Sequence, residues 1–135
     1  MDQILDRLWL GDLEDGRRVD IPCTAVLNLC EHSYDNPAVV LIHAPLTDEV
    51  CHPPHEWQSR VYALQHLLSL GHTVLVHCRL GKSRSPALVT AYLAAAGWDL
   101  AQARLVIQAR RGCVTIHPET WRGVEYWWTQ QGKRA

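Results

Sequence analysis

Residues 73–97 read TVLVHCRLGKSRSPALVTAYLAAAG, and this stretch decides the fold. It opens with the apolar run TVLV, which is typical of a strand buried on both faces. A polar segment with three cations and one glycine follows, and then residues 86–96, which are apolar nearly all round and predict a buried helix. The segment between strand and helix, residues 77–85, therefore lies at the carboxyl end of a strand, where such sheets bind ligands.

Other short apolar runs predict the remaining strands, and apolar residues at helical spacing predict further helices. The expected strands cover residues 25–29, 39–45 and 73–78, with a weaker one near 7–12. The expected helices cover residues 55–70, 86–96 and 99–111, the third capped by Asp99, and a last helix opens at Pro118 with Trp121, Val124 and Trp128 on one face. This order predicts an α/β fold: a small three-layer sandwich with a mostly parallel central sheet of roughly four to five strands flanked by helices.

Length and composition limit what the chain does. Its 135 residues suit one domain, which we expect to span residues 1–135, and the net charge of −1 argues against general affinity for nucleic acid or anionic membranes. No signal peptide is visible, and no apolar run reaches the roughly 18 residues that span a bilayer. The five cysteines are odd in number and include no CxxC pair, which fits a reducing compartment. We therefore expect a cytoplasmic protein without membrane insertion.

The sequence CHPPH at residues 51–55 raises the question of a metal site, because the chain holds eight histidines. Two prolines inside this stretch prevent a helical face with histidines one turn apart. No second pair of ligands stands at the spacing of a zinc finger. We therefore expect neither a metal nor another cofactor.

The layout of strand, loop and helix around residues 77–85 is that of a phosphate-binding loop. Backbone N–H groups of the loop and of the helix N-terminus point toward an anion, and Gly81 allows a positive φ. The GKS at residues 81–83 invites comparison with nucleotide-binding loops. That motif needs a glycine five positions before Gly81, where Val76 stands, so the nucleotide interpretation fails.

The remaining feature of the loop is Cys78. A thiol at a helix N-terminus beside Arg79, Lys82 and Arg84 is expected to be largely a thiolate at neutral pH. The loop then both holds an oxyanion and keeps a nucleophile charged. A thiolate next to a bound phosphate ester is placed for in-line attack on phosphorus.

HCRLGKSRS matches HCx5R[ST] and resembles the loop of the cysteine-dependent protein tyrosine phosphatase superfamily, in its compact dual-specificity group. ILDRLWLGDLED, AVLNL and SPALVTAYLA resemble further segments of that group, so the likeness covers most of the chain. The resemblance implies that Cys78 is the nucleophile, that Arg84 binds phosphate with two hydrogen bonds, and that Ser85 helps the thiolate leave. It also implies that His77 orients the loop and helps to keep the thiol ionised. The phosphate-binding residues would be Arg79, Leu80, Gly81, Lys82, Ser83 and Arg84.

The family also needs a general acid on a separate loop, and PLTDEVCHPP at residues 45–54 resembles that loop. Asp48 stands thirty positions before Cys78 and is the expected acid, with Glu49 as its main rival. Protonation of the leaving oxygen is typically worth about 10²–10⁴-fold in rate. The alternative for Asp48 is an ordinary turn-forming or helix-capping role.

Three residues depart from the usual pattern of the family. Leu80 stands where a small residue is common, and His117 stands where many relatives carry an asparagine that braces the loop. Arg79 and Lys82 add two cations, as in the branch that acts on highly anionic lipid or inositol phosphates. The alternative for these two is ordinary solvated charge.

The sequence therefore predicts a phosphatase that hydrolyses phosphomonoesters, on phosphotyrosine and on phosphoserine or phosphothreonine proteins, through a phosphocysteine intermediate. Its partners would be these phosphorylated substrates. One alternative is a phosphatase of inositol or lipid phosphates with the same mechanism. The others are a non-catalytic phosphate-binding module and a rhodanese-like sulfur transferase, which also uses a loop cysteine.

Overall fold

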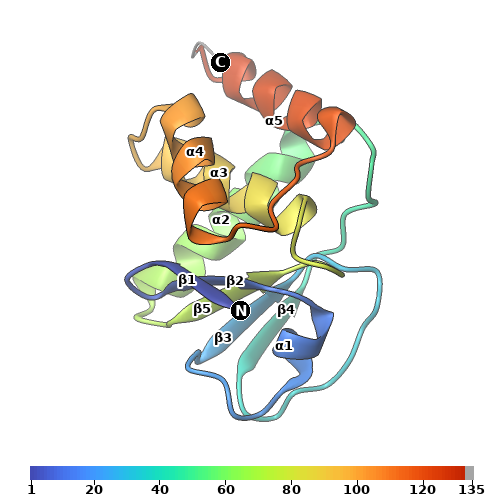
Figure 1. Cartoon of the computed structure of the whole chain (residues 1–135), viewed down its shortest axis with the longest axis vertical. Coiled ribbons are helices and arrows are strands. Elements are labelled where there is room, and N and C mark those ends of the chain that lie inside the picture. The colour runs from blue at the N-terminus through green and yellow to red at the C-terminus, as the bar shows by residue number, and fades with distance from the viewer. Residues whose placement is uncertain (133–135) are drawn as a thin grey trace.

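The computed structural model of the chain describes residues 1–132 and forms a sheet with helices on both faces (Figure 1). The elements in chain order are β1 (Asp2–Leu5), β2 (Leu8–Gly11), α1 (Leu13–Arg17), β3 (Ala25–Asn28), β4 (Val40–His43), α2 (Pro54–Ser69), β5 (Val74–His77), α3 (Arg84–Ala95), α4 (Leu100–Arg110) and α5 (Pro118–Gln130). The strand order is β1-β2-β5-β3-β4, in which β1 runs antiparallel to β2 and the other neighbours are parallel. The predicted α/β class and mostly parallel sheet are confirmed.

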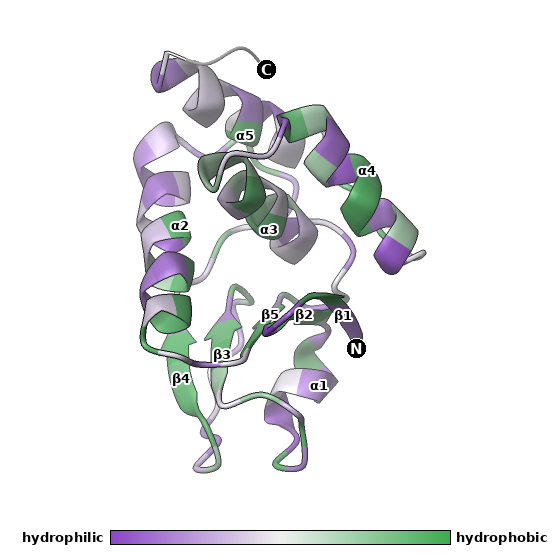
Figure 2. Cartoon of the chain, turned by 90° about the vertical axis from the view of Figure 1, so that its left-hand side faces the viewer, coloured by the Kyte–Doolittle hydropathy of each residue, from purple (hydrophilic) through white to green (hydrophobic). Residues whose placement is uncertain are grey.

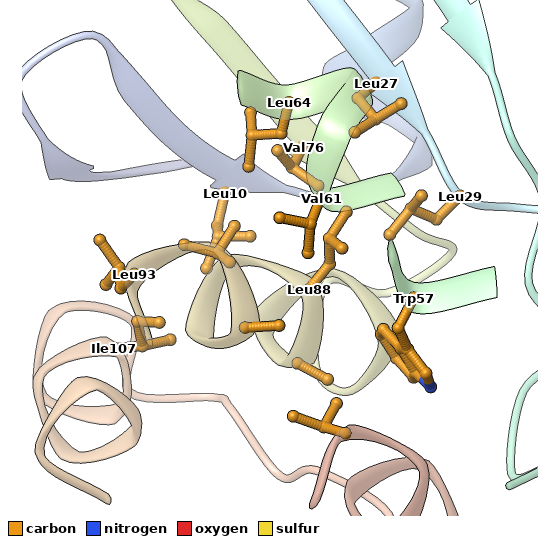
Figure 3. Close-up of a cluster of buried hydrophobic side chains, with 14 of the residues drawn as sticks. Leu10, Leu27, Leu29, Trp57, Val61, Leu64, Val76, Leu88, Leu93 and Ile107 are labelled. Carbon is orange, nitrogen blue, oxygen red and sulfur yellow. The ribbon is translucent and has the colours of Figure 1, made fainter. Parts of the chain in front are cut away.

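The helices are divided unevenly between the two faces of the sheet. Helices α2 to α5 cover one face, and α1 lies against the other (Figures 1 and 2). Strand β5 contributes to both sides, since Val74 and Val76 belong to the main core and Leu75 packs in a smaller cluster on the opposite face. Helix α3 packs against the face of the sheet that α2, α4 and α5 also cover, and Leu88 lies among side chains of the strands and of α2 (Figure 3).

Two short elements were not predicted from the sequence, β1 and α1. Helix α1 has only five residues and includes Gly16, so it shows no apolar periodicity. A capping box forms it instead: the Asp15 N–H donates to the Asp12 carboxylate at 2.9 Å, and the Asp12 N–H donates to the Asp15 carboxylate at 3.0 Å. This small helix matters because it packs behind the loop that follows β5.

The predicted helices are present, with two differences of detail. Helix α3 begins at Arg84, two residues before the predicted start at residue 86, so Arg84 and Ser85 belong to its first turn. The Asp99 cap is confirmed by the hydrogen bond that its side chain accepts from the Gln102 N–H. The apolar face predicted for α5 did not include Trp127. This residue is the most deeply buried tryptophan of the helix, and its indole N–H donates to Gln58.

Within residues 1–132, no helix combines the length and the apolar character that crossing a membrane requires.

Candidate active site

A cleft of about 460 Å³ lies where β5 ends and α3 begins. It combines residues from three separate parts of the sequence: the loop after β5, the loop after β4 and the segment before α5. The lining residues are Asp48, Glu49, Cys78, Arg79, Leu80, Lys82, Ser83, Arg84, Thr115, Ile116, His117 and Pro118. The structure thus brings together Cys78, Arg84 and Asp48, which the sequence analysis selected from distant segments.

Cys78 is the first residue after β5, and only 3% of it is exposed. Its sulfur lies 3.2 Å from the hydroxyl oxygen of Ser85, in the first turn of α3. A hydroxyl at this distance can donate a hydrogen bond to a thiolate. Cys78 and Ser85 therefore form a buried pair at the edge of the cleft.

Arg84 places a buried positive charge in the same cleft. Its Nη1 donates to a Glu31 carboxylate oxygen at 2.7 Å and to the Leu46 carbonyl oxygen at 2.9 Å. Its Nε is buried and has no hydrogen-bond partner among residues 1–132, with the nearest Asp48 oxygen 3.7 Å away. Although burial opposes the charge, the Glu31 hydrogen bond and the charges of Cys78, Glu31 and Asp48 raise the pKa of Arg84. A buried donor of this kind fits an oxyanion bound in the cleft.

Glu31 is a site residue that the sequence analysis missed. It follows the buried end of β3, the strand beside β5, so its carboxylate reaches the Arg84 guanidinium. Burial opposes its charge, but hydrogen bonds from its own backbone N–H and from Arg84 lower the pKa of Glu31. An acidic residue three positions after the end of a buried strand was the available signal.

His77 is fully buried behind the loop and contacts the backbone of Cys78 rather than its sulfur. Its Nδ1 lies 2.9 Å from the Cys78 carbonyl oxygen, which can only accept, so Nδ1 carries the proton. Burial lowers the pKa of His77, which keeps the ring neutral and leaves Nε2 to accept from the Tyr34 hydroxyl at 2.7 Å. Burial also raises the pKa of Tyr34 to about 12, so the phenol keeps its proton. His77 therefore contacts the loop through the Cys78 backbone.

The back of the loop is fixed by β2, α1 and the residue that ends α4. Gly81 has a φ of +70°, as predicted, and a Cβ at this position would lie 2.4 Å from the Gly11 carbonyl oxygen. The Leu13 N–H of α1 donates to the Arg79 carbonyl oxygen at 3.0 Å. Arg111 donates from Nε to the Gly81 carbonyl oxygen at 2.9 Å and from Nη1 to Asp2 at 2.7 Å. No local pattern in the sequence predicted this role of Arg111.

The segment before α5 fixes the other side of the loop through its backbone. The Thr115 N–H donates to the Lys82 carbonyl oxygen at 2.8 Å, and the His117 N–H donates to the Ser83 hydroxyl at 3.0 Å. The His117 ring instead caps α5 by accepting from the Glu119 N–H at 3.1 Å. His117 thus braces the loop through its main chain, and its side chain serves the helix.

Asp48 and Glu49 both line the cleft, in the loop that follows β4. One Asp48 oxygen lies 3.7 Å from Arg84 Nε and also accepts the Glu49 N–H at 3.0 Å. Glu49 has a φ of +60°, in the left-handed region that non-glycine residues seldom adopt. Asp48 therefore lies beside Arg84 in the cleft.

The other loop side chains lie at the rim of the cleft. Arg79, Leu80 and Lys82 are exposed, and Ser83 is half-buried. The two cations are therefore in contact with solvent and also border the cleft. Within residues 1–132, no group of three or more histidine, cysteine or carboxylate side chains is arranged to hold a metal ion.

Comparison with known families gives a match over most of the chain. The family described as "Dual specificity phosphatase, catalytic domain" matches residues 17–129. Among curated proteins, the chain is 47% identical over 53 residues to the protein-tyrosine-phosphatase IBR5 of Arabidopsis thaliana, covering 38% of this chain and 21% of that protein. It is 42% identical over 62 residues to the protein phosphatase Slingshot homolog 3 of Mus musculus, covering 45% of this chain and 9% of that protein. The chain thus matches only a small part of each relative.

Solved structures share the fold at low sequence identity. Human DUSP28 superposes with a TM-score of 0.83 at 22% identity, covering 98% of this chain and 99% of that one. The human tyrosine phosphatase-like serine/threonine/tyrosine-interacting protein superposes with a TM-score of 0.85 at 20% identity, covering 97% of each chain. The family resemblance seen in HCRLGKSRS is confirmed.

Replacing Gly81 tests whether the loop conformation creates the anion site. Gly81→Ala should weaken binding of inorganic phosphate, measured by calorimetry, at least about tenfold, because the new Cβ clashes with the Gly11 backbone and opposes the positive φ. Gly112→Ala is the matched control, since a Cβ there would meet nothing within 4 Å. Equal phosphate affinity in the two variants would contradict the role assigned to Gly81.

Proposed function

The chain belongs to the dual specificity phosphatase catalytic-domain family, and we propose that it hydrolyses phosphate esters on proteins through a phosphocysteine intermediate on Cys78. The observation that carries the proposal is the buried Arg84 Nε, a donor without a partner among residues 1–132, in the cleft that also holds Cys78 and Asp48. The substrates would be phosphotyrosine and phosphoserine or phosphothreonine side chains. The chemistry needs no metal or other cofactor, and its free thiol suits a reducing compartment such as the cytoplasm.

In the first step the loop binds the phosphate and Cys78 attacks it. The backbone N–H groups of residues 79–84, at the N-terminus of α3, donate hydrogen bonds to the phosphate oxygens. Arg84 adds charge-assisted hydrogen bonds. The thiolate forms an S–P bond as the bond from phosphorus to the ester oxygen breaks. Asp48 gives its proton to that oxygen, so an alcohol or phenol leaves rather than an anion.

In the second step water releases the phosphate. Asp48, now ionised, accepts a proton from the water as the water oxygen bonds to phosphorus and the S–P bond breaks. The Ser85 hydroxyl, 3.2 Å from the sulfur, donates a hydrogen bond to the departing thiolate. Inorganic phosphate leaves, and the protein returns to its starting state.

A second candidate function is the hydrolysis of inositol or lipid phosphates by the same steps. The observation that favours it is the position of Arg79 and Lys82, exposed at the rim of the cleft, where they can meet further phosphate groups of a polyanionic substrate. A non-catalytic phosphate-binding module is less well supported, because both Cys78 and Arg84 are present.

Cys78→Ser tests the nucleophile. The variant should bind inorganic phosphate with near-normal affinity but release none from an aryl phosphate, because a serine hydroxyl is mostly un-ionised at neutral pH. Cys113→Ser, which changes an exposed cysteine, is the control and should retain full activity. Steady turnover by pure Cys78→Ser protein would exclude the covalent mechanism, and a wild-type protein that binds phosphate but releases none would favour the non-catalytic module.

Asp48→Asn tests the general acid against its rival. Hydrolysis of phenyl phosphate, which has a poor leaving group, should slow about 10²-fold or more, whereas a dinitrophenyl phosphate should be affected little because its phenol leaves without a proton. Glu49→Gln is the matched variant and should reduce both rates only slightly. If Glu49→Gln instead showed the selective loss, the general acid would be Glu49.

Replacing both Arg79 and Lys82 by glutamine tests the second candidate function. The double variant should lose more kcat/KM on an inositol polyphosphate than on phenyl phosphate, and wild-type preference for the polyanion should fall as salt rises. Arg17→Gln with Arg18→Gln removes the same charge at two exposed residues that do not line the cleft, and is the control. Equal losses on both substrates would mean that these cations serve the loop and carry no substrate preference.

A further inference from the structure

The backbone that leads to Asp48 is fixed by side chains at four consecutive carbonyl groups. Arg60 of α2 donates from Nε to the Ala44 carbonyl oxygen at 3.1 Å and from Nη2 to that of Pro45 at 2.7 Å. Arg84 donates to the next carbonyl oxygen, of Leu46. His52 then lies with Nε2 2.9 Å from the carbonyl oxygen of Thr47, the residue directly before Asp48.

His52 differs from the two arginines because it belongs to the loop itself. Its bond to Thr47 closes a short turn of four residues, 48–51, which includes Asp48 and the left-handed Glu49. These residues have few other fixed contacts, since residues 48–50 are exposed and Cys51 is half-buried. The position of Asp48 over the cleft therefore depends on its ion pair with Arg84 and on the two ends of this turn.

The His52 ring is itself held in one orientation. Its Nδ1 lies 2.5 Å from a carboxylate oxygen of Glu56, one turn into α2, and its side chain is only 11% exposed. A carbonyl oxygen can only accept, so Nε2 donates to Thr47, while Nδ1 is hydrogen-bonded to the Glu56 carboxylate. Both ring nitrogens are thus engaged, and the ring cannot turn without losing both contacts.

Helix α5 packs against the backbone of His52. A Cβ on Gly123 would lie 3.0 Å from the His52 carbonyl oxygen and 2.7 Å from the indole nitrogen of Trp57, so α5 packs directly against the backbone at His52. The Trp57 ring meets the His52 ring edge-on with centroids 6.5 Å apart. Contacts with α2 and α5 therefore hold His52 in place, and its Nε2 donates a hydrogen bond to the loop backbone beside Asp48.

We propose that His52 is a positioning residue for the general acid: its hydrogen bond to Thr47 holds the turn of residues 48–51 so that the Asp48 carboxylate faces the cleft beside Arg84. The proposal rests on the proposed role of Asp48 in proton transfer. Loss of the bond would leave phosphate binding and Cys78 intact and would lower only the step that needs a placed proton donor, because displacement by about 1 Å can cost about 10²-fold in rate.

His52→Phe is the direct variant, because it keeps a planar ring beside Trp57 and removes both hydrogen bonds. We expect kcat on phenyl phosphate to fall about 10- to 100-fold, with kcat on a dinitrophenyl phosphate and both KM values changed less than about threefold. His55→Phe, on an exposed histidine three residues along, is the matched control and should match the wild type. In an Asp48→Asn background, His52→Phe should have almost no further effect, because the two changes remove the same function.

Two Glu56 variants provide an independent test should His52→Phe not fold. Glu56→Leu removes the partner that orients the ring and should reproduce the selective loss, whereas Glu56→Gln keeps a side-chain acceptor and should restore most of the activity. Thermal unfolding of each variant separates these effects from lower stability. Equal losses on both esters, or a full further loss in the Asp48→Asn background, would overturn the positioning role. If Asp48→Asn itself did not alter the ratio of the two rates, the general-acid assignment would fail instead.

Discussion

The Arg84 guanidinium is a buried positive charge, and the arrangement of the site depends on how that charge is satisfied. Leaving such a group without partners in the interior is strongly unfavourable. Glu31 and the Leu46 carbonyl group together receive two hydrogen bonds from Nη1, so the end of β3 and the loop after β4 are both held against the start of α3. Nε is left as a buried donor in the cleft, and an anion bound there would complete its contacts. The Arg84 side chain thus joins three segments of the chain and leaves one buried donor that a bound anion would satisfy.

The loop that surrounds this charge is held by contacts with the structure around it. Gly81 sits against β2, Arg111 and the α1 backbone hold loop carbonyl oxygens, and residues 115–117 hold the opposite side. The carbonyl oxygens of Arg79, Gly81 and Lys82 all accept hydrogen bonds from residues outside the loop. Electrostatic stabilisation works best when the donors do not have to reorganise during the reaction. On this account, much of the structure outside the cleft serves to keep nine residues, 77–85, in one conformation.

The sequence predicted those parts of the protein that repeat a local pattern. Strands β2, β3, β4 and β5 followed from short apolar runs, the main helices followed from apolar residues at helical spacing, and Cys78, Arg84 and Gly81 followed from a motif in one continuous stretch. Glu31, Arg111 and His52 were missed, because each acts through a contact with a residue or carbonyl group that no local pattern identifies. Arg111, for example, meets Gly81 only because α4 returns to the sheet edge where β1 supplies Asp2. Helix α1 was missed because a capping box forms it, without an apolar face.

The central claim is that phosphate passes through a covalent bond to Cys78, and trapping that intermediate tests it most directly. Mixing the protein with a dinitrophenyl phosphate, stopping the reaction with acid within the first turnover and mapping peptides by mass spectrometry would locate the phosphate. The account predicts phosphate on the sulfur of Cys78, formed as fast as the phenol is released. Phosphate on another residue, or complete single-turnover hydrolysis with no phosphorylated protein at any time, would contradict it.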